Sequence, residues 1–130
     1  MALMKFREPN QAKWSGSRPA HNGTQILKYV NADDSVAKIH TANAGVTFYL
    51  THVGITYRAL AVGRAELFIA DDGDVTQATI FSIITTAAGW SIGQTAAFWP
   101  PVEMGAGWYV AIGSNAAGLT VRGFCHGWEE

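Results

Sequence analysis

The chain has 130 residues, of which 48% are hydrophobic and 15% are charged, and its formal net charge is −1. This length fits one globular domain, and a single cysteine excludes an internal disulfide framework or a multi-cysteine zinc site. Charged residues are scarcer than the roughly 25% typical of soluble domains, so we expect part of the surface to be covered by copies of the chain or by a partner.

The first 23 residues contain two prolines, two glycines and no sustained period of 2 or 3.6. We therefore expect an extended N-terminal arm over 1–23, although an unstructured terminus stays an open alternative. Residues 1–28 carry five cations against Glu8 alone, whereas the remainder has nine acids and four cations. Apolar anchors indicate that the arm packs on a surface. The residues expected to dock it are Lys5, Phe6, Arg7, Lys13, Trp14 and Arg18.

From Thr24 onward, short alternating apolar segments are separated by turns rich in Gly, Asn and Asp. This pattern predicts one all-β domain over 24–130, a single antiparallel β-sandwich or jelly roll. The predicted strands cover 25–30, 36–40, 46–53, 55–62, 65–70, 76–85, 94–98, 108–113 and 119–128.

Alternation along these strands assigns side chains to opposite faces. Phe48, Leu50 and Leu67 are predicted to point into the core. The residues predicted to face outward are Tyr49, Phe68, Tyr109, Phe124, His126 and Trp128. An aromatic outer face is costly to keep in water, so we expect it to meet a neighbouring subunit.

One segment matches a catalytic motif. Residues 89–93 read GWSIG, which fits the G-x-S-x-G nucleophile elbow, but that motif needs a helix directly after Ser91. The segment IGQTAAFWPP follows instead, with two adjacent prolines. A glycine-rich strand connection is the prediction, and an esterase stays the third hypothesis.

The remaining polar groups do not assemble into a site. The segment DDGD at 71–74 predicts a hairpin turn, because the twelfth position of a calcium loop would be Ser82 or Ile83 rather than Glu. The four histidines lack metal-binding spacing, and Cys125 is expected to be a small buried residue. We therefore expect no catalytic residue, no metal and no cofactor.

Two tryptophans suggest a second class of function. Trp90 and Trp99 lie beside glycine and proline in loop-like context, where they would contact a neighbouring subunit or stack on a sugar. The basic arm is a weak footprint for nucleic acid, so no direct nucleic-acid partner is expected. No apolar run reaches the length of a membrane span, and charges near the N-terminus do not fit a signal peptide, so we expect synthesis in the cytosol and no membrane partner.

The segments AKIHTANAGVTFYLTHVGIT, AELFIADDGDVT and FWPPVEMGAGWYVAIGSNAAGLTVRGFCHGWEE resemble small β-sandwich structural proteins of tailed bacteriophages. The resemblance covers 36–130, departs from the pattern at Asn43, where proline is frequent, and rests on strand and turn motifs. It implies a non-enzymatic virion protein made in the host cytoplasm. The main interpretation is a capsid decoration protein that forms a homo-oligomer, with a trimer favoured. Its arm is expected to dock on the major capsid protein or another virion protein. The alternative is a glycan- or receptor-binding module of a tail or head fibre.

Overall fold

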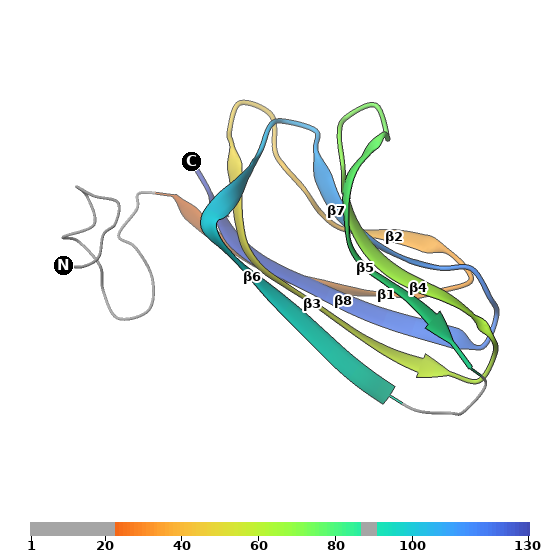
Figure 1. Ribbon diagram of the computed structural model, residues 1–130. Helices are drawn as coiled ribbons and strands as arrows, with labels where there is room; N and C mark the ends of the chain where they lie inside the picture. The colour runs from red at the N-terminus through yellow and green to blue at the C-terminus, as the bar shows by residue number, and fades with distance from the viewer. Residues whose placement is uncertain (1–22, 87–90) are drawn as a thin grey trace, which may run out of the picture.

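The computed structural model describes residues 23–86 and 91–130, which form two packed antiparallel sheets (Figure 1). One sheet has the order β1-β8-β3-β6 and the other the order β2-β7-β4-β5, which confirms the predicted β-sandwich. The strands in these residues are β1 (Thr24–Asp33), β2 (Val36–Thr41), β3 (Phe48–Ala59), β4 (Gly63–Ala70), β5 (Thr76–Thr85), β6 (Ser91–Met104), β7 (Tyr109–Ser114) and β8 (Leu119–Glu129). Within the same residues, no helix is long and apolar enough to cross a membrane.

The prediction of separate strands over 46–53 and 55–62 is wrong, because β3 runs through both segments as one strand. Gly54 lies inside it and pairs with Phe124 of β8. A side chain at Gly54 would collide with the Phe124 ring, so the ring occupies the space that the glycine leaves. Glycine here marks a close approach between strands rather than a turn.

The predicted strand over 94–98 is too short, because β6 continues through Pro100 and Pro101 to Met104. Within residues 23–86 and 91–130, strand β6 is at the edge of its sheet and pairs with β3 alone. The pairing jumps from Leu50–Val102 to His52–Ala97, so both prolines lie in an irregular stretch of an edge strand. Their missing backbone N–H groups therefore break no hydrogen bond between inner strands. The peptide bond between Trp99 and Pro100 is cis.

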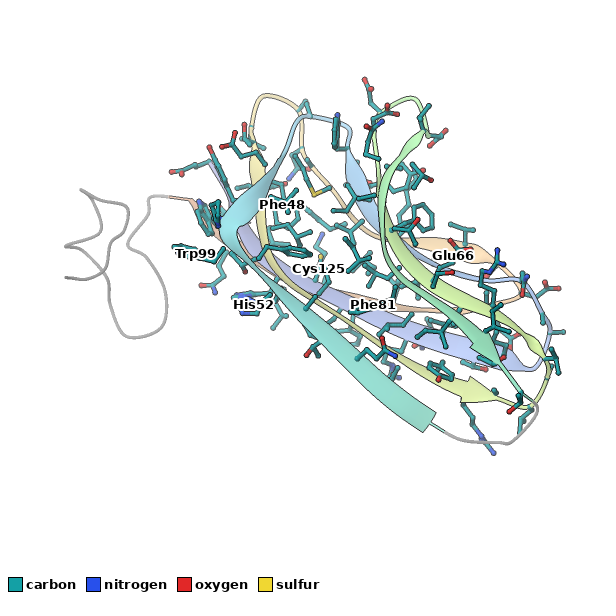
Figure 2. The ribbon with its side chains drawn as sticks, viewed as in Figure 1. Phe48, His52, Glu66, Phe81, Trp99 and Cys125 are labelled. Atoms are coloured by element: carbon teal, nitrogen blue, oxygen red, sulfur yellow. The ribbon has the colours of Figure 1, made fainter. Side chains whose placement is uncertain are left out.

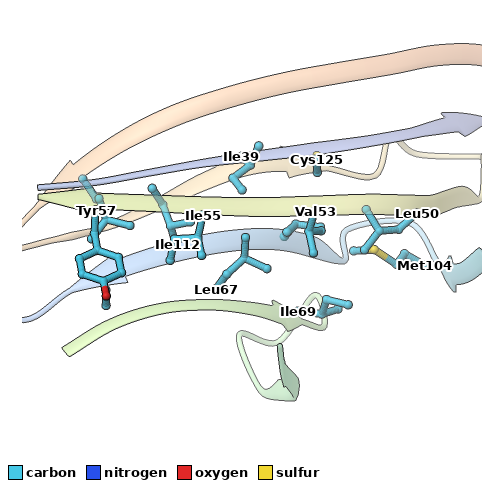
Figure 3. Close-up of a cluster of buried hydrophobic side chains, with 14 of the residues drawn as sticks. Ile39, Leu50, Val53, Ile55, Tyr57, Leu67, Ile69, Met104, Ile112 and Cys125 are labelled. Atoms are coloured by element: carbon cyan, nitrogen blue, oxygen red, sulfur yellow. The ribbon is translucent and has the colours of Figure 1, made fainter. Parts of the chain in front are cut away.

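The core lies between the sheets, where the inward residues of facing strands interdigitate (Figure 3). Phe48, Leu50 and Leu67 are fully buried, as the alternation predicts. Cys125 is also fully buried, and burial raises the pKa of its thiol to about 12. Its expected role as a small core residue is confirmed.

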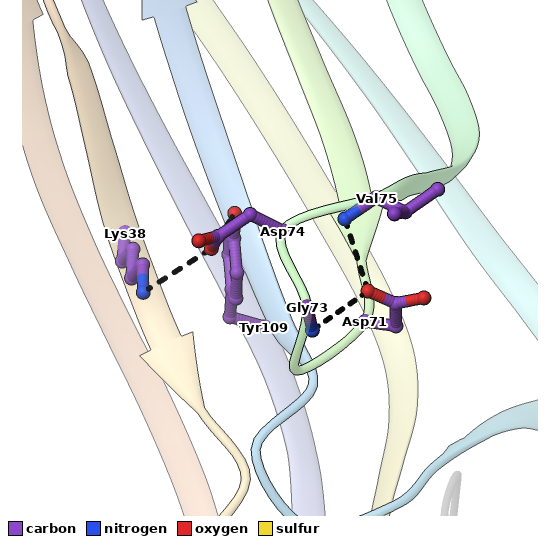
Figure 4. Close-up of polar contacts among 6 residues, drawn as sticks. All are labelled: Lys38, Asp71, Gly73, Asp74, Val75 and Tyr109. Carbon is purple, nitrogen blue, oxygen red and sulfur yellow. Dashed lines mark hydrogen bonds and ion pairs between the residues drawn. The ribbon is translucent and has the colours of Figure 1, made fainter.

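The segment 71–74 forms the predicted turn between β4 and β5 (Figure 4). Asp71 Oδ1 accepts hydrogen bonds of 2.9 Å from the backbone amides of Gly73 and Val75. Asp74 takes a positive φ of 64° and accepts a 2.9 Å hydrogen bond from the Tyr109 hydroxyl. That hydrogen bond, together with burial, raises the pKa of Tyr109. The carboxylates of this turn therefore stabilise the hairpin.

Candidate assembly surface

Large apolar and aromatic side chains gather on the outer surface of the β1-β8-β3-β6 sheet. The strand register brings them together, because Gln25, Trp128 and Tyr49 form one row and Leu27, His126 and His52 form the next. Figure 2 shows that His52 points away from the core. We call this surface the aromatic face and define it by Leu27, Tyr29, Tyr49, His52, Phe124, His126 and Trp128, together with the exposed Trp99 of the edge strand β6.

The aromatic face is partly held in place by its own contacts. The rings of Tyr49 and Trp128 stack with centroids 5.1 Å apart and planes 18° apart. Trp128 Nε1 donates a 3.1 Å hydrogen bond to Glu130. Burial raises the pKa of Tyr49, and the carboxylates of Glu103 and Glu130 raise it further. This edge of the face is therefore aromatic and bordered by acids.

A groove of about 430 Å³ crosses the centre of the aromatic face. The Phe124 ring, which lines this groove, lies over the bare backbone of Gly54. The His52 and His126 rings are 5.6 Å apart in the groove, and Gln25 Nε2 lies 2.6 Å from His126 Nε2. The residues that line it are Leu27, His52, Val53, Thr95, Ala96, Phe124 and His126.

Beyond the aromatic face, the same sheet becomes polar. Arg122 Nε donates a 2.9 Å hydrogen bond to Asn31, and Thr120 donates a 3.1 Å hydrogen bond to Asp33. These pairs occupy the half of the sheet that is remote from Gly23. Among the described side chains of this sheet, the large exposed apolar ones thus lie in the half where β1 begins and β8 ends.

The other sheet does not present the expected aromatic surface. Tyr109 is only 6% exposed and packs with Ala70, Ala111 and the half-buried Phe68. Lys38 Nζ lies 4.1 Å from the centroid of the Tyr109 ring. Tyr109 was predicted to meet a neighbour, but its own chain covers it because the β4–β5 turn and Lys38 close over the ring.

Leu27, Tyr29 and His52 were not predicted from the sequence as surface contacts, although they belong to the aromatic face. Leu27 is 66% exposed and Tyr29 is 69% exposed, and they alternate along β1 with the inward Ile26. Their neighbours on both sides include apolar residues, so alternation alone did not separate the two faces. The pairing of β1 with β8 supplies the missing information.

The alternative chemistries find no support in the described residues. Ser91 begins β6, and a strand follows it where a nucleophile elbow needs a helix. Across residues 23–86 and 91–130, no group of three or more His, Cys, Asp or Glu residues is placed to hold a metal ion. Trp90 and the arm residues Lys5, Phe6, Arg7, Lys13, Trp14 and Arg18 lie outside the described residues.

No protein-family model matches the sequence, and no curated protein matches it. The fold is similar to that of a pentameric capsid protein isolated from metagenomic phage sequences, with a TM-score of 0.52, 16% identity, and coverage of 98% of this chain and 79% of that chain. A second structure with the same description gives a TM-score of 0.46 at 20% identity, and the match covers 80% of this chain but only 60% of that one.

A third similar structure is the virus-like particle of extra small virus from the giant freshwater prawn Macrobrachium rosenbergii. It gives a TM-score of 0.39 at 11% identity and covers 98% of this chain and 94% of that chain. The first of the three structures establishes the shared fold, a small β-sandwich of a kind found in a viral capsid protein.

Proposed function

We propose that the protein is a non-enzymatic structural component of a virion and, within that class, a capsid decoration protein. The strand orders β1-β8-β3-β6 and β2-β7-β4-β5 fit an eight-stranded jelly roll, an architecture used by viral capsid domains. Fold alone does not assign a function. The observation that carries the proposal is therefore the aromatic face, a surface suited to contact with protein.

The exposed members of the aromatic face favour self-association. Leu27, Tyr29 and Trp99 are 66%, 69% and 53% exposed, and each large apolar side chain contributes about 1.5–3 kcal/mol when it is fully buried. Aromatic residues with few charges are typical of the centre of a protein interface. Association of identical copies through this face would remove that surface from water.

The number of copies is proposed to be five. The phage capsid protein that shares the fold is described as pentameric, so the trimer expected from the sequence has no support. A closed ring uses a heterologous contact, in which the aromatic face of one copy meets a different surface of the next. Attachment of the ring to a capsid through the part of the N-terminal arm that precedes Lys13, which carries Lys5, Phe6 and Arg7, remains part of the proposal.

Light scattering coupled to size exclusion tests the proposal on the full chain. We expect a mass close to five copies, and we expect Leu27→Glu to shift the protein toward the monomer. Ile84→Glu is the matched control, because Ile84 is 73% exposed on the other sheet, and it should leave the mass unchanged. A full chain that stays monomeric at high concentration contradicts the proposal.

A glycan-binding module is the competing candidate, because jelly rolls also occur in lectins and Trp99 is 53% exposed. A monomer that binds a sugar saturably, and loses that binding in Trp99→Ala, would favour this second function.

A further inference from the structure

The aromatic face lies next to the point where the N-terminal segment joins the sandwich. Thr24 pairs with Glu129, and Trp128 and Glu129 are close enough to Gly23 that a Cβ there would collide with them. Twenty-two residues precede Gly23. The segment 1–22 therefore joins the described fold at the edge of the aromatic face.

The charges of that segment complement the border of the face. Glu103 and Glu130 are exposed, and both lie close enough to Tyr49 to raise its pKa. The segment 1–22 carries Lys5, Arg7, Lys13 and Arg18 against Glu8 alone. Pairing these cations with exposed carboxylates would orient the segment on the face and speed its association, and would raise its binding affinity less.

The spacing of the apolar residues indicates which copy supplies the segment. Trp14 is separated from Gly23 by eight residues, SGSRPAHN, that contain no large apolar side chain. Eight extended residues span up to about 26–29 Å. That distance is about twice the radius of gyration of a domain of this size, which is about 13 Å. The chain's own face begins at Trp128, beside Gly23, so a spacer of this length suits a neighbouring copy.

We propose that the segment 13–22 of a neighbouring copy binds across the aromatic face, with the Trp14 indole in the groove and Lys13 or Arg18 facing Glu103 and Glu130. The groove volume of about 430 Å³ falls within the roughly 300–1,000 Å³ of sites that hold small organic groups. His52 and Thr95, which also line the groove, carry polar atoms that can accept a hydrogen bond from the indole N–H at an otherwise apolar site. This inference rests on the proposed self-association and specifies the contact that links the copies.

Photo-crosslinking between two forms of the full chain tests the inference. One form carries benzoylphenylalanine in place of Trp14, and the other is a larger, tagged chain without the photoreactive group. On irradiation we expect a product that joins one copy of each form, mapped by mass spectrometry to peptides containing Leu27 or Phe124. Leu27→Glu in the tagged chain should reduce the yield several-fold, whereas Ile84→Glu should not.

Three outcomes would overturn the inference: crosslinks only within one chain, crosslinks to the β2-β7-β4-β5 sheet, or yields unaffected by Leu27→Glu. The proposed function fails separately. A multimer that crosslinks elsewhere leaves self-association standing without this contact, whereas a strictly monomeric chain removes both.

Discussion

Glu129 connects the two sheets at the end of the sandwich where β1 begins. Its Oε2 accepts a 2.8 Å hydrogen bond from His40 Nε2 and a 3.1 Å hydrogen bond from the Asn43 amide, and its Oε1 accepts a 2.7 Å hydrogen bond from Asn43 Nδ2. Desolvation raises the pKa of Glu129, but these hydrogen bonds outweigh it and the net pKa is lowered. A buried carboxylate with three donors stabilises the folded state while it is ionised.

Replacing Glu129 by Gln should destabilise the protein at neutral pH by about 1.5–3 kcal/mol, the usual contribution of hydrogen bonds to a charged group. Because the folded pKa is lowered, the carboxylate's contribution is full above the unfolded value of about 4.3 and is lost as the pH falls through the folded pKa. Urea unfolding of the wild type and Glu129→Gln from pH 7 to pH 3 measures this difference.

The two stability curves should therefore converge as the medium becomes acidic. Glu66→Gln is the control, because Glu66 lies on β4 and makes none of these three hydrogen bonds. A gap between wild type and Glu129→Gln that stays constant from pH 7 to pH 3 would show that ionisation of Glu129 contributes nothing to stability.

At the scale of elements, the β4–β5 hairpin depends on its turn as well as on its strands. Most of β5 is exposed or half-buried, and β5 is the edge strand of its sheet. Asp71 accepts hydrogen bonds from the backbone amides of Gly73 and Val75 and from Gln77 Nε2, each of 2.9 Å. The turn therefore fixes the register of a strand that has few buried side chains of its own.

Asp71→Ala should lower the free energy of unfolding by about 1–2 kcal/mol, because each such hydrogen bond contributes about 0.5–1.5 kcal/mol and exposure reduces the total. Asp72→Ala removes the same charge from the same turn and should change stability by less than about 0.5 kcal/mol. Thermal or chemical denaturation compares the two variants. Equal losses of unfolding free energy in the two variants would mean that the charge of the turn, and not the hydrogen bonds of Asp71, stabilises the hairpin.

The sequence predicted the elements better than it predicted their limits and their faces. Phe48 and Leu50 are buried as alternation requires, because period 2 follows directly from strand geometry. The predicted strands stop before Gly54 and before Pro100, but pairing with β8 and the edge position of β6 allow both residues inside strands. Tyr109 lies outside the core as predicted, yet a turn remote in sequence covers it. Such tertiary contacts leave no local signal.

At the scale of the whole molecule, the two outer surfaces differ in kind. The β2-β7-β4-β5 sheet covers Tyr109 with its own turn and with Lys38. The β1-β8-β3-β6 sheet leaves Leu27 and Tyr29 mostly exposed and carries the groove. This asymmetry is the basis of our account, in which one face of the sandwich joins copies of the chain into an assembly.

Hydroxyl-radical footprinting of the full chain tests this account most directly, with side-chain oxidation measured in the assembled protein and after dilution. Our account predicts that Leu27 and Tyr29 are oxidised several-fold more slowly in the concentrated sample. Val36 and Ile84, which are 64% and 73% exposed on the other sheet, should react at the same rate in both. Equal oxidation of Leu27 and Tyr29 at every concentration would contradict the account.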